Sequence, residues 1–163
     1  MATKIRSKWV DGNLVFTDDA GNKIFSLDGV NKQVVLDDDS QVVKVAKVSL
    51  GAADTGGGVF SWQNPEGKAI IVQRVLVDVT TAATGACTID VGTTATNATT
   101  SSDNLIDGAD IGTATGVFDN YDNSGTNGKT KQKLADGKWV TGSRASGAAA
   151  GTAGFAYIEY VVI

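Results

Sequence analysis

The chain has 163 residues, which is the size of one ordinary domain, and its formal net charge is −4 at pH 7. It contains no histidine and only one cysteine, Cys87, so the commonest general base is missing and an intrachain disulfide is excluded. The acidic balance argues against a nucleic-acid partner, and no apolar run approaches the roughly 20 residues needed to span a bilayer. We therefore expect no enzyme, no cofactor or metal, and no binding to nucleic acid or membrane.

The first forty residues alternate between short β-rich runs and turn residues. Runs at 4–10 and 13–16 flank Asp11-Gly12, a dipeptide that favours a type I′ hairpin turn. Two more runs, at 23–27 and 33–36, follow with glycine-containing turns between them. The pattern predicts a short β-meander over residues 1–40. Such a thin sheet is marginal alone, so the main domain or another protein must supply a surface for it.

Residues 41–163 have the pattern of a β-sandwich. The acidic triplet that precedes Ser40 predicts the boundary, and long apolar or alternating runs follow it. The Thr-, Ser-, Asn- and Asp-rich segment 93–133 predicts long loops around two short strands. No window has a helical apolar stripe. We expect strands at 41–50, 58–62, 69–80, 86–91, 138–141 and 154–163, the last of them a central strand that ends at the chain terminus.

The alternation also predicts a core and an oligomeric state. The terminal residues 160–163 are too apolar to be left on an open sheet edge, so we expect self-association, with a homotrimer as the favoured state. One sandwich interior is predicted to contain the side chains of Phe60, Ile71, Val75, Val77, Ile89, Val91, Phe155, Tyr157 and Val161.

Motifs that would indicate a chemical activity are weak. Gly128-Lys129-Thr130 lacks the earlier glycine of a phosphate-binding loop, and the loop that starts at Asn120 has Lys131 where an EF-hand needs a glutamate. Glu66 and Glu159 have no spacing that indicates glycoside hydrolysis. An irregular Ca²⁺ site stays open as an alternative to solvated loop carboxylates and Asx-turns, and its candidate ligands are Asp103, Asp107, Asp110, Asp119 and Asp122.

Three tryptophans allow two interpretations. Trp9, Trp62 and Trp139 can serve as stacking platforms for sugars, but tryptophan is more often a core residue or an interface anchor. We favour the second interpretation. If Trp62 or Trp139 were exposed beside the acidic loops, a binding module would be favoured instead.

Several segments of the chain together resemble those of a known family. They are Lys4–Phe16, Asp19–Phe25, Val59–Pro65, Ala69–Val79, Asp90–Gly92 and Gly154–Tyr160. The family that they resemble is the capsid decoration (cement) proteins of tailed bacteriophages. The resemblance implies an all-β, jelly-roll-like β-sandwich preceded by a short N-terminal β-meander, usually trimeric, on the outside of an expanded head. It brings no catalytic residue.

The resemblance and the composition lead to one expected function. We expect a virion structural protein that binds the major capsid protein on the capsid exterior and stabilises the expanded lattice, after synthesis in the host cytoplasm. A receptor- or carbohydrate-binding module of a head fibre or tail is the alternative. The two interpretations differ in whether the protein contacts the capsid or a ligand outside the virion.

The N-terminal segment is the predicted capsid contact. Its first ten residues hold three cations, Lys4, Arg6 and Lys8, and no acid, although the chain as a whole is acidic. We expect these cations to complement acidic capsid loops and Trp9 to act as an apolar anchor. The alternative is that the cations are merely solvated and that the meander packs on its own domain.

Overall fold

The computed structural model describes residues 4–30, 33–36, 42–51, 58–97 and 101–163, and the chain divides into two compact units, Met1–Gln41 and Val42–Ile163. The fold is all-β, as predicted: every regular element in the described ranges is a strand, and all strand pairs are antiparallel. The boundary predicted at residues 37–40 falls outside the described residues.

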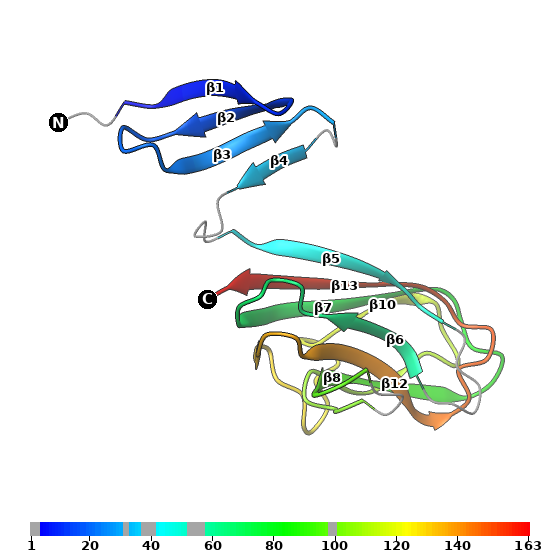
Figure 1. Ribbon diagram of the computed structural model, residues 1–163. Helices are drawn as coiled ribbons and strands as arrows, with labels where there is room; N and C mark the ends of the chain where they lie inside the picture. Colours follow the sequence, from blue (N-terminus) through cyan, green and yellow to red (C-terminus); the bar gives the residue numbers. More distant parts are fainter. Residues whose placement is uncertain (1–3, 31–32, 37–41, 52–57, 98–100) are drawn as a thin grey trace. The chain divides into compact units, whose positions relative to one another are not determined.

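The first unit is the predicted four-stranded meander (Figure 1). Its strands pair in chain order, so each strand lies beside its sequence neighbour. Asp11 and Gly12 both have positive φ, 48° and 80°, which is the backbone that a type I′ turn requires. The strands are β1 (Arg6–Val10), β2 (Asn13–Thr17), β3 (Lys23–Asp28) and β4 (Gln33–Leu36).

The second unit is a sandwich of two antiparallel sheets (Figure 1). One sheet has the order β10-β7-β13-β5, with β11 also paired to β7, and the other has the order β6-β12-β8-β9. Three short strands, rather than the two predicted, begin within the described residues of segment 93–133. The strands are β5 (Lys44–Ser49), β6 (Gly58–Gln63), β7 (Ile70–Thr81), β8 (Cys87–Thr94), β9 (Ile106–Asp110), β10 (Gly116–Asp119), β11 (Gln132–Leu134), β12 (Trp139–Gly147) and β13 (Ala153–Val162).

The C-terminal strand β13 lies between β7 and β5, so the prediction of a central terminal strand is confirmed. Tyr160 pairs with Val72 on one side and with Lys44 on the other, and its side chain is buried. The open terminal edge on which the trimer prediction was based is therefore absent at this residue. The trimer itself stays a prediction.

The core forms between the two sheets, and five of the nine predicted core residues are in it. Phe60, Val75, Val77, Ile89 and Val91 are all buried members of one cluster. Val75, Val77 and Ile89 are fully inaccessible to solvent, as expected for alternate residues that face the opposing sheet.

The other four predicted core residues, Ile71, Phe155, Tyr157 and Val161, are only partly buried and lie outside the core cluster. That part of the prediction is wrong because alternation defines two faces of a strand without saying which one is inward. In β13 the inward residues are Ala156, Ile158 and Tyr160.

In β7 a bulge changes the inward set. Val72 pairs with Tyr160 and Arg74 pairs with Glu159, so Gln73 is an extra residue between them. Inward positions are therefore Ile70 and Val72 before the bulge, and Val75, Val77 and Val79 after it. Ile71 consequently faces away from the core, although it has the same parity as Val75.

Candidate functional site

One face of the meander carries its aromatic side chains, while the opposite face holds Val10 and Val15 beside polar residues. The register of the meander places Trp9 opposite Leu14, Leu14 opposite Leu27, and Leu27 opposite Val34, and residues paired in this way share a face. Phe16 and Phe25 form the next row, with ring centroids 4.3 Å apart in a stacked arrangement. We call these residues the meander apolar face: Trp9, Leu14, Phe16, Phe25, Leu27 and Val34.

Much of the meander apolar face is accessible to solvent. Trp9 is 73% exposed, Val34 59% and Leu27 40%, while Leu14 and the two phenylalanines are partly buried. An exposed apolar patch with an aromatic residue at its edge is typical of a protein interaction site. The sequence signal for it was the alternation itself, which placed an apolar residue at every second position of β2 and β3.

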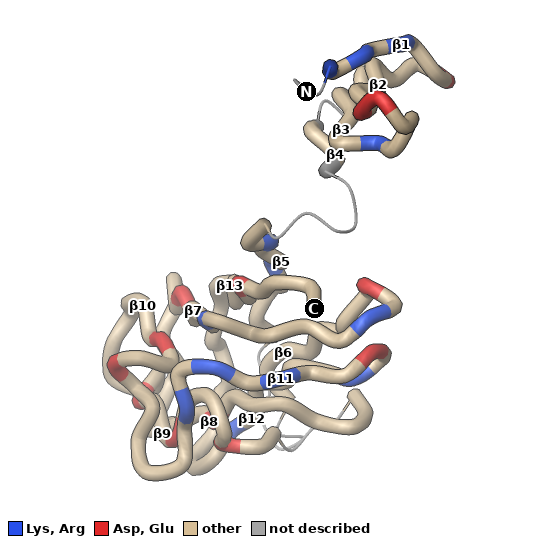
Figure 2. Tube along the Cα trace, turned by 90° about the vertical axis from the view of Figure 1, so that its left-hand side faces the viewer, with Lys and Arg blue, Asp and Glu red and all other residues tan. Residues whose placement is uncertain are grey.

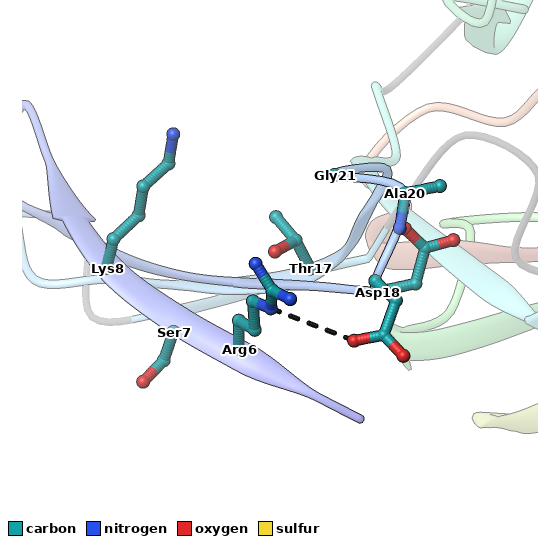
Figure 3. A pocket seen from close by; sticks show the side chains of 8 residues that line it. Arg6, Ser7, Lys8, Thr17, Asp18, Ala20 and Gly21 are labelled. Carbon is teal, nitrogen blue, oxygen red and sulfur yellow. Dashed lines mark hydrogen bonds and ion pairs between the residues drawn. The ribbon is translucent and has the colours of Figure 1, made fainter. Parts of the chain in front are cut away.

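The predicted contact residues are divided between the two faces of the meander. Successive residues of a strand point to opposite faces, so Arg6 and Lys8 lie on one face and Trp9 on the other. Figure 3 shows the side chains of Arg6 and Lys8 on the same side of β1 and Ser7 on the other side. The structure therefore does not bring the cations and the tryptophan together on one surface, although all of them are on the edge strand β1.

The cations of β1 differ in their partners. The Arg6 side chain lies 3.7 Å from an oxygen of Asp19, an ion pair that the dashed line in Figure 3 marks. The backbone N–H of Lys4 donates to the same carboxylate. The Arg6–Asp19 pair is exposed and contributes little to stability. Lys8 forms no ion pair within the described part of the chain. Figure 2 shows the Lys and Arg residues at and beside β1 in blue.

The turn between β2 and β3 is held by Asp18. Its carboxylate accepts hydrogen bonds from the side-chain amide of Asn22 and from the backbone N–H groups of Asn22 and Ala20. These bonds lower the pKa of Asp18, the Asn22 side chain making the largest contribution. Beside β1 the turn borders a shallow hollow of about 390 Å³, whose lining is Arg6, Ser7, Lys8, Thr17, Asp18, Asp19, Ala20 and Gly21.

Three of the carboxylates proposed as Ca²⁺ ligands accept hydrogen bonds from other residues of the sandwich. Asp107 accepts from the backbone N–H groups of Thr126 and Asn127, and Asp103 accepts from the Asn127 side chain. Asp110 accepts from the N–H of Gly112 two residues on, which is an Asx-turn. No group of three or more His, Cys, Asp or Glu that could hold a metal ion occurs among the residues the structure describes.

The other two carboxylate candidates lie at the end of β10 and just after it: Asp119 is the last residue of the strand, and Asp122 is in the loop that follows. Asp119 pairs with Arg74 and accepts hydrogen bonds from the N–H groups of Tyr121 and Asp122. Burial would raise the pKa of Asp119, but the hydrogen bonds and the Arg74 charge outweigh it and lower the pKa. Asp122 takes part through its backbone N–H, while its side chain is exposed.

The two glutamates considered for hydrolysis have separate neighbours. Glu66 accepts hydrogen bonds from the Lys44 ammonium at 2.6 Å and the Tyr160 hydroxyl at 2.7 Å. Glu159 is opposite Arg74 in the register of β13 and β7. The hydrogen bonds from Lys44 and Tyr160 lower the pKa of Glu66, which does not favour Glu66 as a general acid.

Sequence reasoning missed a hollow of about 360 Å³ on the sandwich, lined by Gln73, Arg74, Tyr121 and Glu159. One signal for it was available. Gln73-Arg74 places two consecutive polar residues inside the strand and so breaks its two-residue alternation, as the extra residue of a bulge does.

The two tryptophans of the sandwich, Trp62 and Trp139, are less exposed than Trp9 of the meander. Trp62 is half-buried, packs against the core, and has its ring centroid 5.1 Å from that of Tyr160. Trp139 is also half-buried. Neither is the open platform that was the condition for favouring a binding module on their account.

Comparisons with protein-family models, with the curated proteins and with solved structures found no match for this chain. In the described ranges, no helix is long and apolar enough to cross a membrane.

Proposed function

We propose that the chain is a virion structural protein that binds the outside of a bacteriophage head and stabilises the expanded capsid lattice, without catalytic activity. The observation that carries the proposal is the meander apolar face, three of whose six side chains are at least 40% exposed. It supports the predicted need of the meander for a surface to lie on. The half-burial of Trp62 and Trp139 also favours this function over the alternative binding module.

The arrangement of the sandwich supports a jelly roll as its finer fold. One sheet holds β5, β7, β10, β11 and β13, and the other holds β6, β8, β9 and β12. Most successive strands therefore alternate between sheets, as they do when a long hairpin is wound into a double-sheet jelly roll.

The partner is a capsid surface rather than a second meander. With strands about 4.8 Å apart and about 3.3 Å per residue, the meander apolar face measures roughly 15 by 17 Å. The area of a face with these dimensions is well below the roughly 800 Å² that each partner buries in a stable interface of standard size. Face-to-face pairing of two meanders would thus be weak, whereas a homotrimer could place three meanders on one capsid and gain avidity.

The charge of β1 defines the chemistry of the capsid surface. Arg6 and Lys8 lie on the edge strand β1 but on the face opposite Trp9, so the capsid surface that fits this edge carries carboxylates beside the apolar patch that Trp9 contacts. Binding only the assembled lattice stabilises it by about 2.7 kcal/mol per site when the protein is present at a hundredfold excess over Kd.

Co-sedimentation with expanded, undecorated phage heads tests the proposal. The intact protein should sediment with expanded heads and not with procapsids. Trp9→Ala should bind heads at least about tenfold more weakly, because the substitution removes the most exposed apolar side chain of the face. Val10→Ala is the matched control, since Val10 is exposed on the same strand but points to the other face.

The outcomes are distinct. If Trp9→Ala and Val10→Ala bind heads as well as the intact protein, the meander apolar face is not the contact. If the intact protein does not sediment with any expanded head, the proposed function is wrong. Lys8→Ala should mainly slow association and reduce its dependence on salt.

A further inference from the structure

The hollow lined by Gln73, Arg74, Tyr121 and Glu159, which we call the Tyr121 hollow, lies where β7 carries its bulge. The extra residue Gln73 and its neighbour Arg74 come from the bulge itself, and Glu159 comes from the paired strand β13. Tyr121 comes from the loop after β10, the strand on the other side of β7. Bulges re-aim side chains and are common beside functional sites.

Two buried polar residues hold the walls of the Tyr121 hollow. The Asp119 side chain is only 5% exposed, and its carboxylate accepts from Nε and Nη2 of Arg74. The same carboxylate accepts the N–H of Tyr121 at 2.9 Å. Asp119 thus positions both the guanidinium and the start of the tyrosine loop.

Asn120 links the loop after β10 to the strand β7 through hydrogen bonds. It is fully buried, and its side-chain oxygen accepts the N–H of Val75, just after the bulge, at 2.8 Å. Its amide nitrogen donates to the backbone carbonyls of Lys129 and Thr130 at 3.2 and 3.0 Å. The loop and the bulge are therefore joined by hydrogen bonds before any ligand arrives, and such pre-organisation reduces the entropy lost on binding.

The charges of the Tyr121 hollow disfavour an anionic ligand. Asp119 neutralises Arg74, and Glu159 adds a further negative charge beside the guanidinium. Phosphate or carboxylate recognition needs a guanidinium that is free to form two hydrogen bonds to the ligand. Here both the Nε and one terminal nitrogen of Arg74 already bond to Asp119.

The remaining groups fit a flat polyol. The Arg74 guanidinium carbon lies over the Tyr121 ring, 5.7 Å from its centroid, and the residue is still 50% exposed, so the part of the ring that Arg74 does not cover is available to the apolar C–H face of a ligand. The other lining residues supply polar groups: the Gln73 amide donates and accepts hydrogen bonds, and the Glu159 carboxylate accepts them. Arg74 adds the guanidinium N–H groups that do not bond to Asp119. The volume of about 360 Å³ is at the lower end of small-ligand sites, which span roughly 300–1,000 Å³.

We propose that the Tyr121 hollow binds a neutral saccharide, one or two sugar units long. The sugar lies with its C–H face on Tyr121, and its hydroxyl groups bond to Gln73, Glu159 and Arg74. An open site of this size gives a Kd of about 1 mM for a single sugar, and several copies on one particle would strengthen attachment to a glycan-bearing surface. This inference does not depend on the meander or on capsid binding.

Amide NMR spectra of the full chain, titrated with glucose, galactose, mannose and N-acetylglucosamine to about 50 mM, test the proposal. At least one of these sugars should produce saturable shifts at Tyr121 and Gln73. Tyr121→Ala should weaken binding about tenfold or abolish it, with little change in Tm because the side chain is half exposed.

Tyr157→Ala is the matched control. Tyr157 is also an aromatic residue on the outer side of this sheet, but it does not line the hollow, and the Lys47 ammonium lies 5.5 Å from its ring. It should bind sugar like the intact protein. Glu159→Gln should lower affinity by about threefold or less, because the amide oxygen still accepts a hydrogen bond to a neutral ligand.

Three results would overturn the proposal. The first is the absence of saturable shifts with all four sugars. The second is an equal loss of binding in Tyr121→Ala and Tyr157→Ala. The third is binding of inorganic phosphate or an acidic sugar in preference to every neutral one, which would mean that the hollow recognises negative charge.

Discussion

The meander and the sandwich use the same two-residue alternation with different results. In the sandwich, alternate residues such as Val75 and Ile158 are fully buried between two sheets. In the meander, the alternate residues Trp9, Leu27 and Val34 form a face on a single sheet and remain exposed. Alternation creates an apolar face, but only a second layer turns that face into a core. A single layer keeps its apolar face available for a partner.

Removing the meander gives the largest expected effect. A chain that begins at Val42 should still unfold cooperatively, because the core cluster lies within Val42–Ile163. It should lose detectable binding to expanded heads. Thermal unfolding and co-sedimentation measure the two properties separately. Unchanged decoration by the shortened chain would place the capsid contact on the sandwich.

Residues on the two faces of β13 should differ strongly in their contribution to stability. Ile158 is fully buried, so Ile158→Ala should lower the free energy of unfolding by about 2–5 kcal/mol. Phe155 lies outside the core with the Lys47 ammonium 3.7 Å from its ring centroid, so Phe155→Ala should cost about 1 kcal/mol. Denaturant unfolding measures both. Equal losses would mean that the inward face of β13 is assigned wrongly.

Replacing one glycine of each unit by alanine should destabilise only the unit that contains it, and by less than the core substitution Ile158→Ala does. A Cβ on Gly142 would lie 2.3 Å from an atom of the buried Phe60 ring, so Gly142→Ala should destabilise the sandwich by about 1–3 kcal/mol. Gly12 has open space around it but a φ of 80°, so Gly12→Ala should strain only the β1–β2 turn, by about 1 kcal/mol. The Tm of the sandwich should fall for the first variant and stay unchanged for the second.

The smallest expected effect is a pH dependence at Glu66. Burial would raise the pKa of Glu66, but hydrogen bonds from Lys44 and Tyr160 outweigh it, so the pKa falls below its ordinary value of 4.5. A carboxyl group whose pKa is lowered by folding stabilises the folded state at pH values above its ordinary pKa. This contribution is lost as the pH falls through the folded-state pKa. The stability difference between the intact protein and Glu66→Gln should therefore shrink between pH 6 and about pH 3. A difference that does not change with pH would mean that Glu66 gains nothing from ionisation.

Strand positions were predictable because their signals are local. Asp11-Gly12 indicated the hairpin, and its two positive φ angles agree with the turn that this dipeptide favours. The apolar run before the chain terminus indicated a central strand, which β13 is. The Tyr121 hollow was not predictable in the same way, because Arg74 and Asp119 are 45 residues apart and meet only across the pairing of β7 with β10.

By itself, the sequence determined that this protein is all-β, that it begins with a four-stranded meander, and where most of its strands lie, since turn chemistry and alternation act over a few residues. The tertiary structure alone decided which side of each strand is inward. In β7 that choice depends on one bulged residue, Gln73, which changes the inward positions from Val72 to Val75. A bulge arises from the pairing of two strands, and pairing partners distant in the chain are set by packing of the whole sandwich.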